Sequence, residues 1–216
     1  MANHAFCYAA ARMKVAVCIP CHGDPKLAFM VSLGQLLLHT VKAQIGLIAG
    51  SSATLPGIRQ SLVKAAITGG ADYILWLDAD HTFPPDALAR LLSHDLDVVG
   101  ANYAKRLMPE QPTASLGPGL WFATTRELAE KGALTEVDAM GLGLCLMKTS
   151  VFSKIEKPYF LNEPSEDGEN FVGEDYYLFR KLGAAGVKIF VDHQLSWSVG
   201  HISQTILTNA GTKGTT

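Results

Sequence analysis

Short apolar runs alternate with longer segments of helical periodicity through the first half of the chain. Four apolar runs have the length of strands, and they cover residues 14–20, 44–49, 73–77 and 96–100. Three intervening segments predict helices, at residues 26–39, 58–68 and 84–93. Because strands and helices alternate through short links, we predict a mostly parallel sheet with right-handed crossovers and helices on its faces.

The second half of the chain is more irregular. Strand-like segments are expected at residues 120–124, 134–138, 141–147, 187–191 and 196–201. Short helices are expected at residues 149–155 and 173–182. No linker separates the halves, so we predict one domain over residues 1–216, with halves at about 14–104 and 105–201 and a loose tail at 202–216.

Composition narrows the class of protein. The 216 residues are 48% hydrophobic and 18% charged, which is typical of a folded α/β protein and not of a disordered chain. The net charge of −2 provides no basic field for a nucleic acid backbone or an anionic membrane. No apolar run reaches the ~20 residues of a membrane span, and no signal peptide pattern opens the chain. We therefore expect a cytoplasmic protein without a membrane span, for which nucleic acid is a disfavoured partner.

The cysteines raise three other possibilities. The segment Cys18-Ile-Pro-Cys21-His22 matches the attachment pattern of c-type haem and contains the spacing of zinc and redox pairs. Haem attachment requires export, however, and the isolated Cys7 and Cys145 offer zinc no second close pair. We interpret Cys18 as a core residue and Cys21 as a loop residue of a protein from a reducing compartment, and a redox role for this pair stays open.

Two carboxylates follow the apolar run at residues 73–77. Asp78 and Asp80 are two residues apart, so in an extended chain both side chains would face one spot beyond the carboxyl end of the strand. Open α/β sheets bind their ligands at such ends. Carboxylate oxygens there suit a hard cation, Mg²⁺ or Mn²⁺, shared with the phosphates of a substrate. The alternative is an Asp-rich turn without a ligand.

Two further motifs lie near the end of the chain. Glu174 and Asp175 open a predicted helix, where acidic residues can also serve only to cap free N–H groups and complement the helix dipole. His201 lies at the end of the last predicted strand, and its alternative role is that of an ordinary surface or core histidine.

These motifs occur in a particular order: Val-Ala-Val-Cys-Ile-Pro20, Asp78-Ala-Asp80, Gly-Glu-Asp175 and Gly-His201. In this order the chain resembles GT-A fold glycosyltransferases, most closely the family 2-type enzymes with their short bacterial and phage members. The resemblance spans residues 14–201 and implies a Rossmann-like, mostly parallel sheet with a smaller mixed β region in the C-terminal half. One departure is the first loop, Cys-His-Gly-Asp, where many members have Thr/Ser-Tyr/Phe-Asn.

The resemblance implies transfer of a sugar from a nucleotide-diphosphate donor, with a UDP-sugar favoured, to an acceptor. It assigns Asp80 and His201 as ligands of Mn²⁺ or Mg²⁺, while Asp78 contacts the ribose or helps hold the metal. It assigns Asp175 as the general base of an inverting reaction and Glu174 as an acceptor or structural contact. In a retaining enzyme, Asp175 would only position the acceptor.

Donor contacts are expected at the ends of the predicted elements. The expected donor-binding residues are Pro20, His22, Asp24, Arg59, Asp78, Lys105 and Gly143. Instead of contacting the donor, Arg59 could lie on a solvent-exposed helix face, and Gly143 could serve only the packing of its strand.

Two other functions stay open. A nucleotidyltransferase can share this sheet, but its Gly-rich basic loop is a poor match to the Cys-His-Gly-Asp-Pro of this chain. A catalytically silent nucleotide-sugar-binding module would keep the donor pocket and tolerate loss of Asp175. The sequence leaves open the sugar, the oligomeric state and the acceptor, whether glycan, protein or small molecule.

Overall fold

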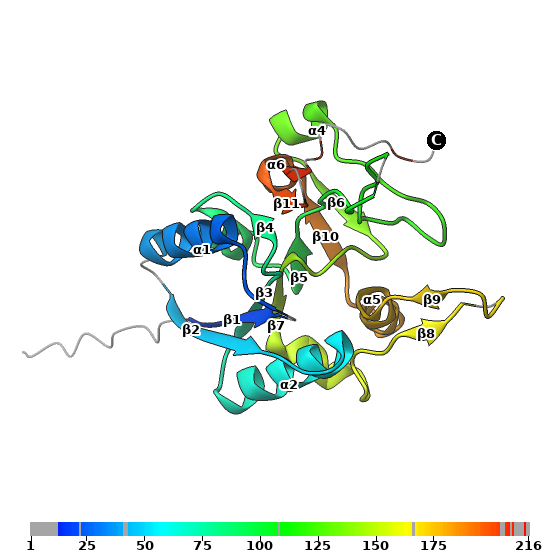
Figure 1. Cartoon of the computed structure of the whole chain (residues 1–216), viewed down its shortest axis with the longest axis horizontal. Helices are drawn as coiled ribbons and strands as arrows, with labels where there is room; N and C mark the ends of the chain where they lie inside the picture. The colour runs from blue at the N-terminus through cyan, green and yellow to red at the C-terminus, as the bar shows by residue number, and fades with distance from the viewer. Residues whose placement is uncertain are drawn as a thin grey trace, which may run out of the picture.

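A mixed sheet of seven strands forms the centre of the protein in the computed structural model (Figure 1). The structure describes residues 13–21, 23–40, 43–107, 109–165, 167–203, 206–207, 209 and 214. The strand order is β2-β1-β3-β7-β5-β10-β6. In chain order these strands are β1 (Lys14–Pro20), β2 (Gln44–Gly50), β3 (Tyr73–Leu77), β5 (Val98–Gly100), β6 (Leu134–Val137), β7 (Leu144–Lys148) and β10 (Ile189–Asp192).

The two halves of the chain share this sheet. Strand β1 pairs in parallel with β2 and β3, and β5 pairs in parallel with β10. Strand β7 from the second half lies between β3 and β5 and runs antiparallel to both, and β6 runs antiparallel to β10 at the edge. The predicted α/β class with a Rossmann-like sheet is therefore confirmed, with two strands reversed.

Helices cover both faces of the sheet. One face packs against α1 (Leu27–His39) and α3 (Ala87–Ser93), and the other against α2 (Leu55–Thr68) and α5 (Glu174–Ala184). Strand β1 serves both layers, because alternate side chains of a strand point to opposite faces. Val17 packs on the side of α1, whereas Cys18 packs on the side of α2. None of the helices among the described residues is both long and apolar enough to cross a membrane.

Short elements complete the architecture and position the site. They are β4 (His81–Thr82), α4 (Arg126–Glu130), a 3₁₀ helix (Thr149–Lys154), β8 (Glu163–Pro164), β9 (Phe171–Val172), α6 (His193–Ser198), β11 (Gly200–Ile202) and β12 (Ile206–Leu207). Strands β12, β11 and β4 form a small sheet in which His201 lies opposite His81. This pairing brings the end of the chain next to the residues that follow β3.

Two predicted elements near the C-terminus were wrong in part. Residues 196–198 belong to helix α6 and not to a strand, because the Asp192 side chain accepts the Leu195 N–H at 3.0 Å and caps the helix. Strand β11 then begins only at Gly200. Within the tail expected from residue 202, β12 pairs with β11, so this part of the tail belongs to a sheet.

The backbone at Asp78 and Asp80 also differs from the prediction. The chain turns here, with the His81 N–H donating to the Asp78 carbonyl at 3.2 Å, and does not continue as an extended strand. The turn sends the two carboxylates to different partners.

The predicted core role of Cys18 is confirmed. Its side chain is fully buried, and Cys18, Cys21 and Cys145 are all free thiols. Cys7 and His22 lie outside the described residues.

Candidate active site

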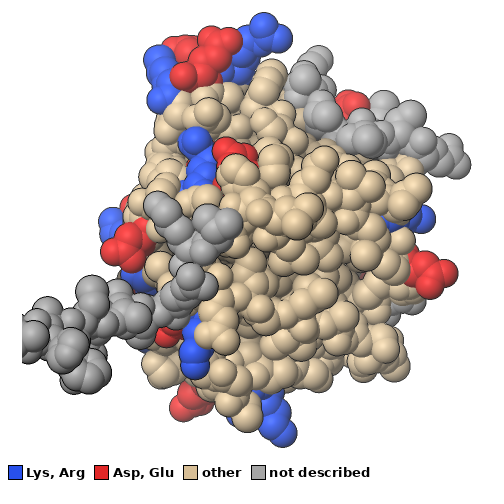
Figure 2. Space-filling model, turned by 90° about the vertical axis from the view of Figure 1, so that its left-hand side faces the viewer, with Lys and Arg blue, Asp and Glu red and all other residues tan. Residues whose placement is uncertain are grey.

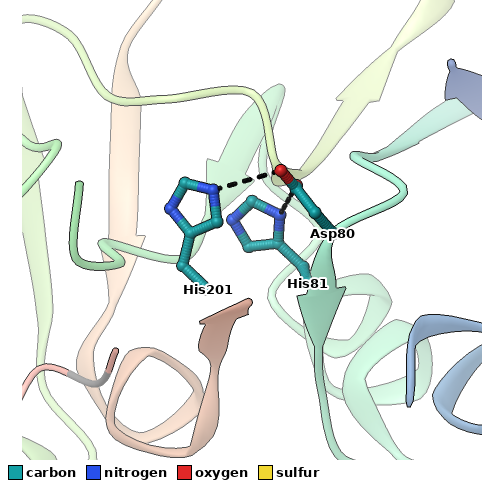
Figure 3. A group of neighbouring side chains, drawn as sticks. All are labelled: Asp80, His81 and His201. Carbon is teal, nitrogen blue, oxygen red and sulfur yellow. Dashed lines mark hydrogen bonds and ion pairs between the residues drawn. The ribbon is translucent and has the colours of Figure 1, made fainter. Parts of the chain in front are cut away.

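Asp80 is the centre of a cluster at the carboxyl end of β3 (Figure 3). Its Oδ1 lies 3.1 Å from Nδ1 of His81, and its Oδ2 lies 3.4 Å from Nε2 of His201. The exposed Arg106 reaches the same Oδ2 at 3.0 Å. One ligand atom from each of Asp80, His81 and His201 lies within 4.8 Å of the others. The geometry suits a group that holds one cation.

A backbone carbonyl fixes the position of one ring hydrogen of His201. Nδ1 of His201 lies 2.8 Å from the carbonyl oxygen of Ala104, which can only accept, so Nδ1 carries a hydrogen. In the neutral ring Nε2 is then a bare acceptor that faces Oδ2 of Asp80, which is also an acceptor. Two facing acceptors require a positive charge between them, either a proton on Nε2 or a metal ion.

His81 completes the cluster, although no sequence motif pointed to it. It is fully buried, stacks on His201 with ring centroids 4.3 Å apart, and contacts the Tyr103 ring edge-on at the same distance. Burial lowers the pKa of His81, which keeps the ring neutral. Its Nε2 is buried without a hydrogen-bond partner. The sequence feature that could have identified His81 as a site residue is its position directly after Asp80.

The charge of Asp80 is stabilised within the cluster. Burial alone would raise the pKa of this carboxyl group. Hydrogen bonds from His201 and His81 outweigh burial and hold the pKa of Asp80 well below its usual range. Asp80 is therefore a carboxylate at neutral pH, as a metal ligand must be.

Gly143 supports the cluster from the neighbouring strand segment. A Cβ at this position would lie 2.5 Å from Cε1 of His81 and 2.8 Å from Cζ of Tyr103. The Gly143 N–H donates to the Tyr103 hydroxyl at 2.9 Å, and the Gly143 carbonyl accepts the Asp78 N–H at 3.0 Å. Position 143 thus requires glycine, because any side chain would clash with His81. The predicted contact of Gly143 with a donor sugar stays a prediction.

Arg59 links two of the predicted site residues. Its Nη2 lies 3.0 Å from Oδ1 of Asp78, and its Nε lies 3.0 Å from Oε1 of Glu174. The side chain is only 2% exposed, so Arg59 does not lie on a solvated helix face. Burial opposes its charge, but Asp78 and Glu174 outweigh burial and raise the pKa of Arg59. Arg59 therefore ties the end of β3 to the start of α5.

Asp175 lies beside this ion-pair network at the second position of α5. Burial and the neighbouring Glu174 carboxylate raise the pKa of Asp175 to about 7. Its Oδ1 accepts the Tyr176 N–H at 2.8 Å, so the residue also satisfies one free N–H of the helix start. A carboxylate of this pKa can accept a proton at neutral pH.

Lys105 lies near Asp175 and packs on Trp121. Its Nζ is 3.0 Å above the centroid of the Trp121 ring. Burial lowers the pKa of Lys105 to about 8, although the charge of Asp175 opposes this shift. Lys105 and Asp175 are therefore close enough for their charges to interact. Contact of Lys105 with a donor stays a prediction.

The loop after β1 reaches the same edge of the sheet. Pro20 ends β1 and is buried, whereas Asp24 is exposed in the following loop. The Lys26 N–H donates to the Ala79 carbonyl at 3.0 Å, which joins this loop to the turn between Asp78 and Asp80. His22, the third residue predicted here, lies outside the described residues.

Comparisons with known proteins bear on the fold. No family model and no curated protein sequence matches this chain. Among solved structures, the crystal structure of A197 from STIV is similar, with a TM-score of 0.63. The alignment covers 91% of this chain and 94% of that chain at 16% sequence identity. A likeness at this identity shows a shared fold and leaves the activity to be argued from the site.

Proposed function

We propose that this protein is a GT-A fold glycosyltransferase that moves a sugar from a nucleotide-diphosphate donor, preferably a UDP-sugar, to an acceptor hydroxyl. The observation that carries the proposal is the cluster of Asp80, His81 and His201 at the carboxyl end of β3. It is accompanied by Asp175, a carboxylate whose pKa is raised to about 7. Ligands of α/β sheets bind at such strand ends.

The residues present fit a divalent cation. Asp80 offers an ionised carboxylate, and Nε2 of His201 lies 3.4 Å from its Oδ2. His81 adds a neutral imidazole. Because this set mixes nitrogen with oxygen, it suits Mn²⁺ better than Mg²⁺, which prefers oxygen ligands in a strict octahedron. When bound, the cation supplies electrostatic stabilisation of the negative charge that develops on the leaving diphosphate.

Residues of α5 would activate the acceptor hydroxyl. Asp175 accepts the proton of the acceptor hydroxyl as this oxygen attacks the sugar on the face opposite the diphosphate, which inverts the configuration. Glu174 is held by Arg59 at 3.0 Å and is only 8% exposed, so its role is to position the start of α5. The two neighbouring carboxylates thus have separate tasks.

The donor is held by groups around the Asp78–Asp80 turn. Asp78 keeps a side-chain exposure of 25% despite its contact with Arg59, which leaves it accessible to a ribose hydroxyl. Arg106 has an exposed side chain and contacts Asp80 alone among the described ion pairs, so it can turn to a phosphate when a cation engages Asp80. Pro20, His22, Asp24, Lys105 and Gly143 complete the proposed donor site.

For the acceptor we propose a chemical class and not a particular molecule. With a net charge of −2, the protein favours a glycan, a protein or a small molecule over nucleic acid. The free thiols of Cys18, Cys21 and Cys145 agree with a proposed location in the cytoplasm.

The test is Mn²⁺-dependent hydrolysis of a panel of nucleotide sugars, because transferases slowly pass their donor to water. We expect one donor to release nucleoside diphosphate, and Asp80→Asn or a chelator to abolish the release. Glu127→Gln, which changes an exposed carboxylate on α4, is the matched control. Donor binding without release, with or without acceptors, would instead indicate a silent binding module. Release of pyrophosphate from a nucleoside triphosphate and a sugar phosphate would indicate a nucleotidyltransferase.

A further inference from the structure

The two edges of the central sheet differ in how they are protected. Strand β6 ends one edge with only four residues, and its Glu136 pairs with Lys188 at 2.9 Å. Strand β2 ends the other edge with seven residues, Gln-Ile-Gly-Leu-Ile-Ala-Gly, none of them charged and none proline. Exposed edges normally carry charge, proline or a short strand to prevent pairing. In the described part of the chain, β2 pairs with β1 alone.

The unpaired backbone groups of β2 are arranged symmetrically. The Gln44 N–H donates to the Met13 carbonyl, and the Gly50 carbonyl accepts the Cys21 N–H, so the even-numbered residues of β2 point toward β1. By the alternation of a parallel ladder, the N–H and C=O groups of residues 45, 47 and 49 point away from β1. These three pairs of donors and acceptors are symmetric about residue 47.

The surface around β2 is apolar. Leu47 is 54% exposed at the centre of the strand. Helix α1, on the same side of the molecule, exposes Leu27 by 80%, Val31 by 53% and Leu38 by 85%, and residues 27–38 carry no charge. Figure 2 shows this side, with Lys, Arg, Asp and Glu mostly around the margin of a broad uncharged area. Such a surface matches another uncharged surface better than a charged partner.

We propose that a second copy of this chain docks here, with β2 pairing antiparallel to β2 of the other copy about a two-fold axis through Leu47. Only this register places Leu47 opposite Leu47 and Ile45 opposite Ala49, so that all three outward-facing residues of each strand find both hydrogen-bond partners. A self-complementary edge is what an isologous interface requires. The sheet then continues from one copy to the other.

The first test measures mass by sedimentation velocity over a range of protein concentrations. The wild type is expected to reach twice the 23.2 kDa of one chain. Leu47→Lys sets two like charges opposite each other on the axis and should weaken association by about tenfold or more. Phe171→Lys, which removes a 74% exposed side chain from β9, should leave association unchanged. A wild type that stays monomeric, or a Leu47→Lys dimer of unchanged affinity, overturns the proposal.

The second test uses only the wild type and measures amide hydrogen exchange by NMR. The amides of Ile45, Leu47 and Ala49 should exchange more slowly as concentration rises, whereas those of Gly46 and Ile48, which face β1, should not change. Protection of the three amides at every concentration would mean that another segment of the same chain covers the edge, and this result contradicts the proposal. So does rapid exchange at concentrations where dimers are present.

Discussion

Nε2 of His201 lies 3.4 Å from Oδ2 of Asp80, while the other ring nitrogen of His201 donates to the Ala104 carbonyl. The two residues are far apart in the sequence and meet because β11 pairs with β4. This contact limits what the site can hold, since two acceptors face each other and either a proton on Nε2 or a metal ion relieves their repulsion.

Replacing His201 should therefore impair donor turnover without disturbing the fold. We expect His201→Gln to lower Mn²⁺-dependent donor hydrolysis by about tenfold or more, because the proposed metal site loses one ligand. His39→Gln, at the exposed end of α1, serves as the control and should behave as the wild type. Equal metal-dependent rates in both variants would contradict the role of His201.

Substitution of Gly143 tests the packing beneath the cluster. Gly143→Ala places a Cβ 2.5 Å from Cε1 of His81, so the buried imidazole must shift. We expect a loss of about 1–3 kcal/mol in the free energy of unfolding, as for other overpacked sites, together with weaker Mn²⁺ dependence. Gly183→Ala, whose Cβ meets nothing within 4 Å in helix α5, should be neutral or stabilise by up to about 1 kcal/mol. Urea unfolding of both variants measures the difference.

Asp175 should set the pH dependence of transfer. Because its pKa is raised to about 7, the fraction that can accept a proton, and with it the rate of sugar transfer, should rise as pH passes from 6 to 8. Asp175→Asn should lower transfer by about 10²–10⁴-fold and leave donor binding unchanged. A transfer rate that stays flat across this pH range, or an active Asp175→Asn variant, contradicts its role as the base.

The same residue should affect stability with a definite sign. The folded state disfavours ionised Asp175, since burial raises its pKa from the ordinary value of 3.8 to about 7. Stability is therefore lost progressively as pH rises from about 4 to about 7 and stays constant above that. Asp175→Asn should raise the melting temperature relative to the wild type at pH 8 but not at pH 3.5. Equal differences at both pH values would mean that burial does not shift this pKa.

Arg59 should be essential to the fold around the site. Arg59→Gln leaves the carboxylates of Asp78 and Glu174 without their partner, and breaking a buried pair costs about 3–5 kcal/mol. Lys64→Gln changes an exposed cation on the same helix and should stay within about 0.5 kcal/mol of the wild type. Guanidinium unfolding gives both values, and similar stabilities of the two variants would contradict the structural role of Arg59.

Local patterns predicted the first half of the fold well. Strand β3 is fully buried and β1 is buried from Val15 onward, and the length and composition of these apolar runs were sufficient to find them. Helix α2 begins three residues earlier than predicted, because Thr54 caps it and a proline lies in its first turn. Helix α6 was missed, since its few residues carry no clear period and its cap, Asp192, ends the preceding strand.

Candidate site residues were harder to place, because their partners are remote in sequence. The sequence drew attention to Asp80 and His201, but the third member, His81, emerged only from the pairing of β4 with β11. Likewise, the contacts of Arg59 with Asp78 and Glu174 depend on how α2 and α5 pack on the sheet. Periodicity predicts the elements, whereas such contacts follow from tertiary packing.

The most direct test of the central claim is Mn²⁺ binding to the wild type, measured by the EPR signal of free Mn²⁺ with and without UDP. We predict saturable binding that UDP strengthens, because the phosphates add ligands, and that Asp80→Asn weakens by at least about tenfold. His39→Gln should bind as the wild type does. A wild type that leaves all Mn²⁺ free under both conditions would mean that Asp80 and His201 share a proton and not a metal ion.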